Sequence, residues 1–152
     1  MRLALFQPDI PQNTGTMLRM AMCLNIGVDI IEPCGFVFSD KQLRRAGMDY
    51  LEQVDVTRHS SWEKFKDSAL VRGVRIVLLS TRADTVYTDF TFHRDDIIMV
   101  GRESAGVPDD VFDAANSQLG IPMNEGARSL NVAISAAMVL GEGLRQISTP
   151  DG

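Results

Sequence analysis

The sequence predicts an α/β domain built on a mostly parallel sheet with helices on both faces. Short apolar runs that suit β-strands alternate with segments of helical periodicity along most of the 152 residues, which is the pattern of consecutive βα units. A hydrophobic content of 45% is enough for a packed core, and a chain of this length corresponds to one domain. We therefore expect a single domain over residues 1–152.

The elements can be assigned in chain order, beginning with a strand, "RLALF", at 2–6. After a proline-containing loop, Asn13 or Thr14 can cap a helix that runs to about Asn25, because short polar side chains accept hydrogen bonds from the first helical amides. Residues 82–95 show no clear periodicity and are expected to form a loop. Further strands are predicted at 28–33, 53–57, 75–81, 96–101 and 117–122, with helices at 39–46, 61–71 and 108–115.

A last helix is predicted at 129–146, and its middle is apolar almost all round. The stretch "VAISAAMVL" at 132–140 leaves almost no polar face, which indicates a helix that is buried on several sides. In so small a domain something besides the sheet must cover this helix. We expect a second subunit to do so, which makes the protein a homodimer.

Charge and cysteine content exclude several classes of protein. The net charge is −5, so a broad basic surface for nucleic acid is absent and any such site must be local. Cys23 and Cys34 have neither CxxC spacing nor a histidine cluster beside them, so we expect no metal site and two reduced core thiols. The sequence shows no signal peptide and no membrane-spanning run. These features predict a soluble, cytoplasmic protein without a membrane partner.

Three loops that follow predicted strands suggest a ligand pocket, because ligands of parallel α/β sheets bind at the carboxyl ends of the strands. They are "LLSTRAD" (78–84), "VGRESAGVP" (100–108) and "LGIPMNEGARSLN" (119–131). Glycines in the last two would let a ligand approach the backbone closely, since glycine has no Cβ. Any one such loop is better explained by turn geometry alone. The three together favour a binding site.

Familiar nucleotide and nucleophile motifs are missing from these loops. No GxGxxG follows the first strand and no GxxxxGK[ST] occurs, which argues against a Rossmann dinucleotide site and a P-loop. Ser104 has no patterned histidine partner, so a serine nucleophile is not indicated. A basic cluster, Lys41, Arg44 and Arg45 followed by Arg58, is either a solvated face or a local RNA footprint.

Five segments resemble, in order and spacing, the motifs of the SPOUT class of RNA methyltransferases. More closely, they resemble the small tRNA 2′-O-methyltransferases that act on the wobble nucleotide. The resemblance covers about Leu3 to Gln146. The segments are "PDIPQNTGTMLRM" (8–20), "IIEPCGFVFSDKQLRRAGMDY" (30–50), "VTRH" (56–59), "VGRESAGVP" (100–108) and "IPMNEGARSLNVAISAAM" (121–138).

The resemblance implies a fold, a cofactor and an assembly. It implies a deep C-terminal trefoil knot over about 75–146, S-adenosylmethionine as methyl donor, tRNA as substrate, and a homodimer whose subunits share the active site. By match to the family's motifs, the cofactor-binding residues are Leu79, Gly101, Glu103, Ile121, Ser129 and Leu130.

The resemblance also assigns catalytic roles to Asn13 and Arg19 and favours RNA binding for the basic cluster. Arginine stays protonated in proteins and is a poor general base, so we expect Arg19 to clamp an RNA phosphate and stabilise the developing alkoxide. Without the resemblance, the simpler interpretation of Arg19 would be a surface ion pair with a carboxylate. Gly141 stands where close relatives carry a tyrosine. A ribosomal RNA 2′-O-methyltransferase and a non-catalytic RNA-binding protein remain the alternatives.

Overall fold

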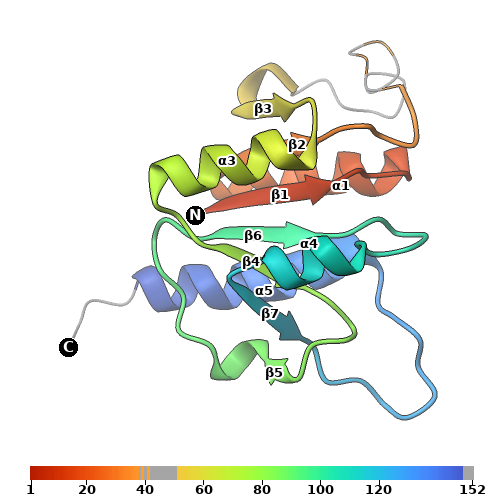
Figure 1. Ribbon diagram of the computed structural model, residues 1–152, viewed down its shortest axis with the longest axis vertical. Helices are drawn as coiled ribbons and strands as arrows, with labels where there is room; N and C mark the ends of the chain where they lie inside the picture. The colour runs from red at the N-terminus through yellow and green to blue at the C-terminus, as the bar shows by residue number, and fades with distance from the viewer. Residues whose placement is uncertain (38, 40, 42–50, 149–152) are drawn as a thin grey trace.

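The computed structural model describes residues 1–37, 39, 41 and 51–148, and these form three layers, with a sheet between two layers of helices (Figure 1). The described strands make one seven-stranded sheet in the order β3-β2-β1-β6-β4-β7-β5, and every pair is parallel. The predicted α/β fold with a parallel sheet is therefore confirmed. The strands are β1 (Arg2–Phe6), β2 (Gly27–Ile31), β3 (Val56–His59), β4 (Ile76–Leu79), β5 (Thr85–Val86), β6 (Ile97–Val100) and β7 (Ser117–Gly120).

The helices divide between the two faces of the sheet. The helices are α1 (Pro11–Leu24), α3 (Trp62–Arg72), α4 (Asp109–Ala114) and α5 (Val132–Ser148), with 3-10 turns at Leu51–Gln53 and Tyr87–Asp89. α1 and α5 contact each other on one face, and α3 and α4 cover the other (Figure 1). Side chains alternate accordingly along β1: Leu3 and Leu5 join the core under α1 and α5, and Ala4 and Phe6 the core under α3 and α4.

Several boundaries differ from the sequence prediction, and local chemistry explains them. α1 begins at Pro11 and its cap residue, Ile10, makes no side-chain hydrogen bond, so the expected caps Asn13 and Thr14 lie inside the helix. Proline suits the first helical position, where the backbone N–H would lack a partner anyway. The third strand lies at 56–59 instead of 53–57, because residues 51–53 form a 3-10 turn.

Two further differences lie in the second half of the chain. The region 82–95, expected to be a loop, contains β5 and a 3-10 turn; a two-residue strand is too short to leave a periodic pattern. α5 begins at Val132 instead of 129, because Asn131 caps it. The Asn131 side-chain oxygen accepts hydrogen bonds from the backbone N–H of Ala133 (2.9 Å) and Ile134 (3.3 Å).

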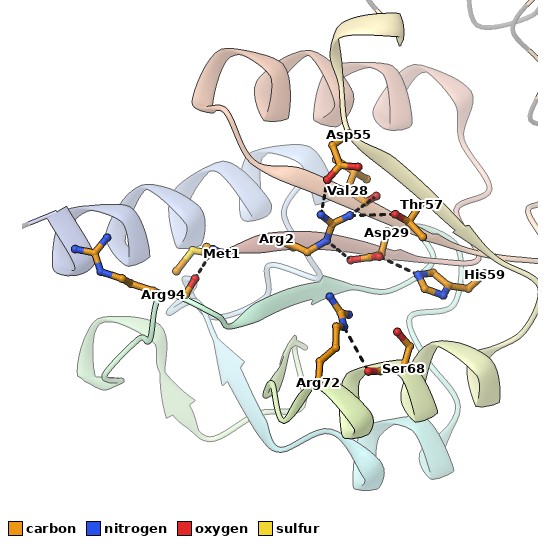
Figure 2. A network of polar contacts seen from close by, with 10 residues as sticks. All are labelled: Met1, Arg2, Val28, Asp29, Asp55, Thr57, His59, Ser68, Arg72 and Arg94. Carbon is orange, nitrogen blue, oxygen red and sulfur yellow. Dashed lines mark hydrogen bonds and ion pairs between the residues drawn. The ribbon is translucent and has the colours of Figure 1, made fainter.

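A network of charged side chains ties together the first three strands (Figure 2). Arg2 lies between two carboxylates: its Nε donates to Asp29 at 2.8 Å and another guanidinium nitrogen donates to Asp55 at 2.7 Å. The other oxygen of Asp29 lies 2.8 Å from His59 Nε2. Asp29 is only 2% exposed, so these partners supply the hydrogen bonds that a buried carboxylate requires.

The two cysteines are free thiols, but the expectation that both lie in the core is wrong for one of them. Cys23 is exposed on α1, and Cys34 is half-buried. Burial raises the pKa of the Cys34 thiol to about 11. No helix in the described part of the chain has the length and apolar character needed to cross a membrane.

Candidate functional site

A pocket of about 570 Å³ opens at the carboxyl ends of β4, β6 and β7, a volume typical of small-molecule sites. All three loops singled out in the sequence contribute to its wall, and the first residues of α1 and α5 close it. After β1 the chain winds outward to β2 and β3, and β6 lies on the other side of β1. The pocket therefore lies beside the point where the strand order reverses, the usual ligand position in such sheets.

The structure brings the predicted cofactor residues together. The lining includes both apolar side chains and small polar groups, so that an aromatic base and its polar edges can both be accommodated. The predicted residues among the lining are Leu79, Gly101, Glu103, Ile121, Ser129 and Leu130, and the predicted catalytic residue Asn13 lies beside them.

The loop after β6 folds back on itself, which explains its two glycines. The backbones of Arg102 and Gly106 exchange hydrogen bonds of 3.0 and 2.8 Å, and Gly106 has a φ of +60°, a conformation that favours glycine. A Cβ on Gly101 would lie 2.8 Å from the Gly106 carbonyl carbon. Gly101 is thus required by the closure of the loop itself, whereas the sequence analysis explained it by close approach of a ligand.

Asp9 and Glu103 form a pair of carboxyl groups at the pocket. Glu103 lines the pocket, and Asp9 lies in the loop after β1. The backbone N–H of Asp9 donates to Glu103 Oε2 at 3.1 Å, and the backbone N–H of Glu103 donates to Asp9 Oδ1 at 3.1 Å. A side-chain hydrogen bond between the two carboxyl groups is the main reason that the pKa of Asp9 is lowered. Burial, and then the same side-chain hydrogen bond, raises the pKa of Glu103.

Asn131 connects the predicted catalytic residue Asn13 to the start of α5. Its side-chain amide donates to Asn13 Oδ1 at 3.0 Å while its oxygen caps the helix. The sequence analysis missed Asn131, although an asparagine directly before an apolar helical run is a recognised start signal. Asn131 itself lines the pocket, so its hydrogen bond holds Asn13 at the edge of the pocket.

Arg19 is not brought into this pocket within one chain. It lies six residues beyond Asn13 on α1, about 9 Å along the helix axis. Its side chain is exposed, and no described residue forms a hydrogen bond or ion pair with it. The expected alternative, a surface ion pair of Arg19, is therefore not present among the described residues.

The basic cluster is described only in part. Lys41 is exposed, whereas Arg44 and Arg45 lie outside the described residues. Arg58 is half-exposed and forms an ion pair with Glu32. Another arginine, Arg82, was not predicted from the sequence to belong to the site but lines the pocket. It donates to Asp109 at 2.6 Å, and its guanidinium carbon lies 4.4 Å from the Phe112 ring centroid.

No group of three His, Cys, Asp or Glu side chains that could hold a metal ion occurs in residues 1–37, 39, 41 and 51–148.

Comparison with known proteins supports the resemblance. The SpoU rRNA methylase family matches residues 1–141. The chain belongs to the SpoU methylase family. Its relatives in this family include the tRNA (cytidine(34)-2′-O)-methyltransferase of Beijerinckia indica, which is 58% identical over 95% of this chain and 91% of the relative. The enzyme of the same name from Escherichia coli K12 is 36% identical over 99% of this chain and 96% of the relative.

Solved structures of SpoU methylases share the fold over almost the whole chain. A structure described as giving insights into the 2′-OH methylation of C/U34 on tRNA superposes with a TM-score of 0.89 and 37% identity, covering 97% of this chain and 95% of that one. The SpoU methyltransferase AviRb of Streptomyces viridochromogenes, solved with the cofactor AdoMet, has a TM-score of 0.86 and 26% identity, covering 97% of this chain and 58% of that one. The predicted membership of the SPOUT class is confirmed.

Proposed function

We propose that this SpoU methylase transfers a methyl group from S-adenosylmethionine to the ribose 2′-oxygen of the wobble nucleotide, cytidine or uridine 34, of tRNA. The observation that carries the proposal is the convergence of the six predicted cofactor residues on one pocket in a chain that matches C/U34 enzymes over nearly its full length. The likeness to an AdoMet-bound SpoU structure supports the choice of cofactor.

The pocket residues fit this cofactor. Leu79, Ile121 and Leu130 offer apolar walls for the adenine, and loop backbone groups can bond to its edge. One oxygen of Glu103, Oε1, is buried without a hydrogen-bond partner, which leaves an acceptor for a ligand N–H or O–H. Bound S-adenosylmethionine supplies an electrophilic methyl group. The protein has to fix the cofactor, exclude water and aim the ribose oxygen.

Arg19 and Asn13 are the proposed catalytic residues. The guanidinium of Arg19 has no partner among the described residues and can form a bidentate contact with an RNA phosphate. In this position it would also stabilise the negative charge that develops on the 2′-oxygen. The proton leaves to that phosphate or to water. Asn13, held by Asn131 at the edge of the pocket, would orient the ribose.

A homodimer completes the proposed site. One face of α5 packs inside the chain, while Ile134 (54% exposed) and Met138 (37% exposed) lie on its outer face beside Ala137. A second copy on this face would cover them and bring Arg19 of one protomer toward the pocket of the other. Gly141 is exposed on the same helix and a Cβ there would contact nothing.

Ala137→Glu is expected to yield monomers or aggregates without activity. A stable, active wild-type monomer in sedimentation would contradict the dimer.

The remaining parts of the proposal concern the domain and its knot. We propose one catalytic domain over residues 1–152 with the knot over about 75–146, acting on tRNA in the cytoplasm. The loop after β6 and the segment 121–131 wall the same pocket, which is where a knotted C-terminal segment would close around the cofactor. Basic residues Lys41, Arg44, Arg45 and Arg58 are proposed to contact the RNA backbone.

Mass spectrometry of tRNA nucleosides tests the activity. Cells that lack the gene are expected to lose 2′-O-methylcytidine or 2′-O-methyluridine from position 34, and the purified protein is expected to restore it to their tRNA with S-adenosylmethionine. The matched control is the Arg19→Ala protein. Unchanged tRNA together with loss of a ribosomal 2′-O-methyl group would favour the ribosomal alternative, and cofactor binding without any methyl transfer would favour a non-catalytic RNA-binding protein.

A further inference from the structure

Asp9 fastens the loop after β1 to the loop after β6 by reciprocal hydrogen bonds. Its backbone N–H donates to Glu103 Oε2 and its Oδ1 accepts from the Glu103 backbone N–H, each at 3.1 Å. Its second oxygen, Oδ2, accepts from the hydroxyl of Ser104. The backbone N–H and both carboxylate oxygens of Asp9 therefore bind two consecutive residues, Glu103 and Ser104, of the loop that closes the pocket.

The position of Asp9 is itself fixed from a third segment, the one that follows β2. The backbone N–H of Gly35 donates to the Pro8 carbonyl at 2.9 Å. A Cβ on Gly35 would lie 2.6 Å from the Asp9 Cβ, so the absence of a side chain at 35 makes room for Asp9. β1 lies between β2 and β6 in the sheet. Asp9, which follows β1, therefore lies between the segment after β2 and the segment after β6.

This arrangement decides which oxygen of Glu103 faces a ligand. Oε2 is occupied by the Asp9 N–H, whereas Oε1 is buried and has no partner. A buried carboxyl oxygen without a hydrogen bond costs free energy that only a bound group or water can recover. Glu103 lines the pocket, so a ligand bound there can supply the group that satisfies Oε1.

We propose that Asp9 is a positioning residue of the cofactor site: it holds the 101–106 loop so that Glu103 Oε1 accepts a hydrogen bond from an N–H or O–H of the bound cofactor. This inference rests on the proposed function, since it assumes that the pocket binds S-adenosylmethionine. Asp9 acts through Glu103 and Ser104 and does not itself line the pocket.

Calorimetry with S-adenosylhomocysteine tests the proposal on the full-length protein without any need for turnover. Asp9→Ala removes both side-chain acceptors, and we expect it to weaken binding by about tenfold or more. Asp9→Asn is expected to stay within about threefold of wild type, because its amide oxygen can accept from the Glu103 N–H and its NH₂, in the place of Oδ2, can donate to the Ser104 hydroxyl oxygen. Asp67→Asn, at an exposed position on α3, is the control for loss of one negative charge.

Amide hydrogen exchange provides a second readout in the protein without ligand. Residues 101–106 are expected to exchange about tenfold faster in Asp9→Ala than in wild type, with α3 unchanged. If Asp9→Ala does not fold, Ser104→Ala is the second variant. It removes one of the two hydrogen bonds that the Asp9 carboxylate accepts from the loop and should accelerate exchange of the same amides. Unchanged exchange in a folded Ser104→Ala protein would then overturn the proposal.

Two binding results would also overturn it: affinity of Asp9→Ala within threefold of wild type, or an Asp9→Asn protein as weak as Asp9→Ala. A raised KM for tRNA with unchanged S-adenosylhomocysteine affinity would assign Asp9 to the RNA site and likewise contradict the proposal. A wild-type protein that binds S-adenosylhomocysteine and methylates no tRNA would contradict the proposed function, while the loop exchange would still report on Asp9.

Discussion

Two clusters of charged side chains lie at opposite ends of β1, and they are built on different electrostatic principles. At the start of the strand, Arg2 joins Asp29 and Asp55, so a cation lies between anions (Figure 2). Beyond the end of the strand, Asp9 faces a second carboxyl group, Glu103, one oxygen of which is buried without a partner. The first cluster is complete within the fold. The second is not.

The difference separates charged residues that the fold needs from those that we propose a ligand needs. A buried carboxylate that meets opposite charges costs little once its hydrogen bonds are made. Two carboxyl groups side by side perturb each other's pKa and add no stability in the way an ion pair does, so such pairs are concentrated at functional sites. We therefore expect substitutions at the start of β1 to change stability, and those beyond its end to change ligand binding and turnover.

Substitution of Arg19 is expected to have the largest effect, because Arg19 is an exposed cation without a partner among the described residues. Arg19→Ala is expected to lower tRNA methylation by about 10³-fold, on the order of 4 kcal/mol of transition-state stabilisation. Cofactor affinity and the free energy of unfolding should not change. Arg19→Lys should recover little, since an ammonium cannot form the bidentate contact. Near-normal turnover in either variant, measured under single-turnover conditions, would place the catalytic charge elsewhere.

Asp29→Ala tests the other side of the comparison. It leaves Arg2 and His59 without their buried partner, and we expect a loss of about 3 kcal/mol in the free energy of unfolding, the low end for a broken buried pair because Arg2 keeps Asp55. Denaturant unfolding measures this loss. The methylation rate per folded molecule should stay at the wild-type value, so a large rate defect would show that this network also serves the site.

Gly101→Ala tests whether the closure of the 101–106 loop shapes the pocket wall. The new Cβ would lie 2.8 Å from the Gly106 backbone, so the loop has to open although no charge changes. We expect S-adenosylhomocysteine to bind about tenfold more weakly, on the order of 1.4 kcal/mol. Gly73→Ala is not a neutral control, because Gly73 has a φ of +68°; Gly141→Ala, where a Cβ contacts nothing, is the suitable one. Wild-type affinity in Gly101→Ala would show that the loop closure does not shape the pocket.

The smallest expected effect is a change in the pH dependence of stability at the carboxyl pair. Because the folded-state pKa of Glu103 is raised above 4.5, protonated Glu103 contributes stability that is complete below pH 4.5 and is lost as the pH rises through the raised pKa. Glu103→Gln is permanently neutral and should lack this decline. Asp9, whose pKa is lowered from 3.8, contributes in the opposite sense: stability present above that value is lost as the pH falls through the lowered pKa. Unfolding curves from pH 3 to 8 measure both contributions to the free energy of unfolding, with exposed Glu125→Gln as the control. If stability still declines with rising pH in Glu103→Gln, Glu103 is not the group responsible.

Much of the fold was predictable because its signals are local. Apolar runs and helical periodicity identify β1, β6, α3 and α5 to within a few residues. β5 was missed because two residues carry no period, and its place at the sheet edge is decided by pairing with β7. The start of α1 was misplaced because Pro11 begins the helix without any side-chain cap.

The candidate site was predictable where family motifs or loop position identify a residue, and not where two distant segments meet. The six residues proposed to bind the cofactor line one pocket. The contacts of Asp9 with Glu103 and of Asn13 with Asn131 could not be deduced, because each joins residues about a hundred positions apart. Arg19 is the reverse case: its proposed role needs a second protomer, which no single chain contains.

The hydrogen bond between Asn13 and Asn131 can form only late in synthesis. The two residues are 118 positions apart, and a ribosome adds about 5–20 residues per second, so roughly 6–24 s separate their appearance. For most of that interval β1 has no β6 to pair with, since Arg2 pairs with Ile97. The apolar surface of α1 therefore becomes fully buried only after most of the chain, including α5, has been synthesised. Contacts of such long range slow folding, and we expect the nascent protein to depend on chaperones until α5 has been made.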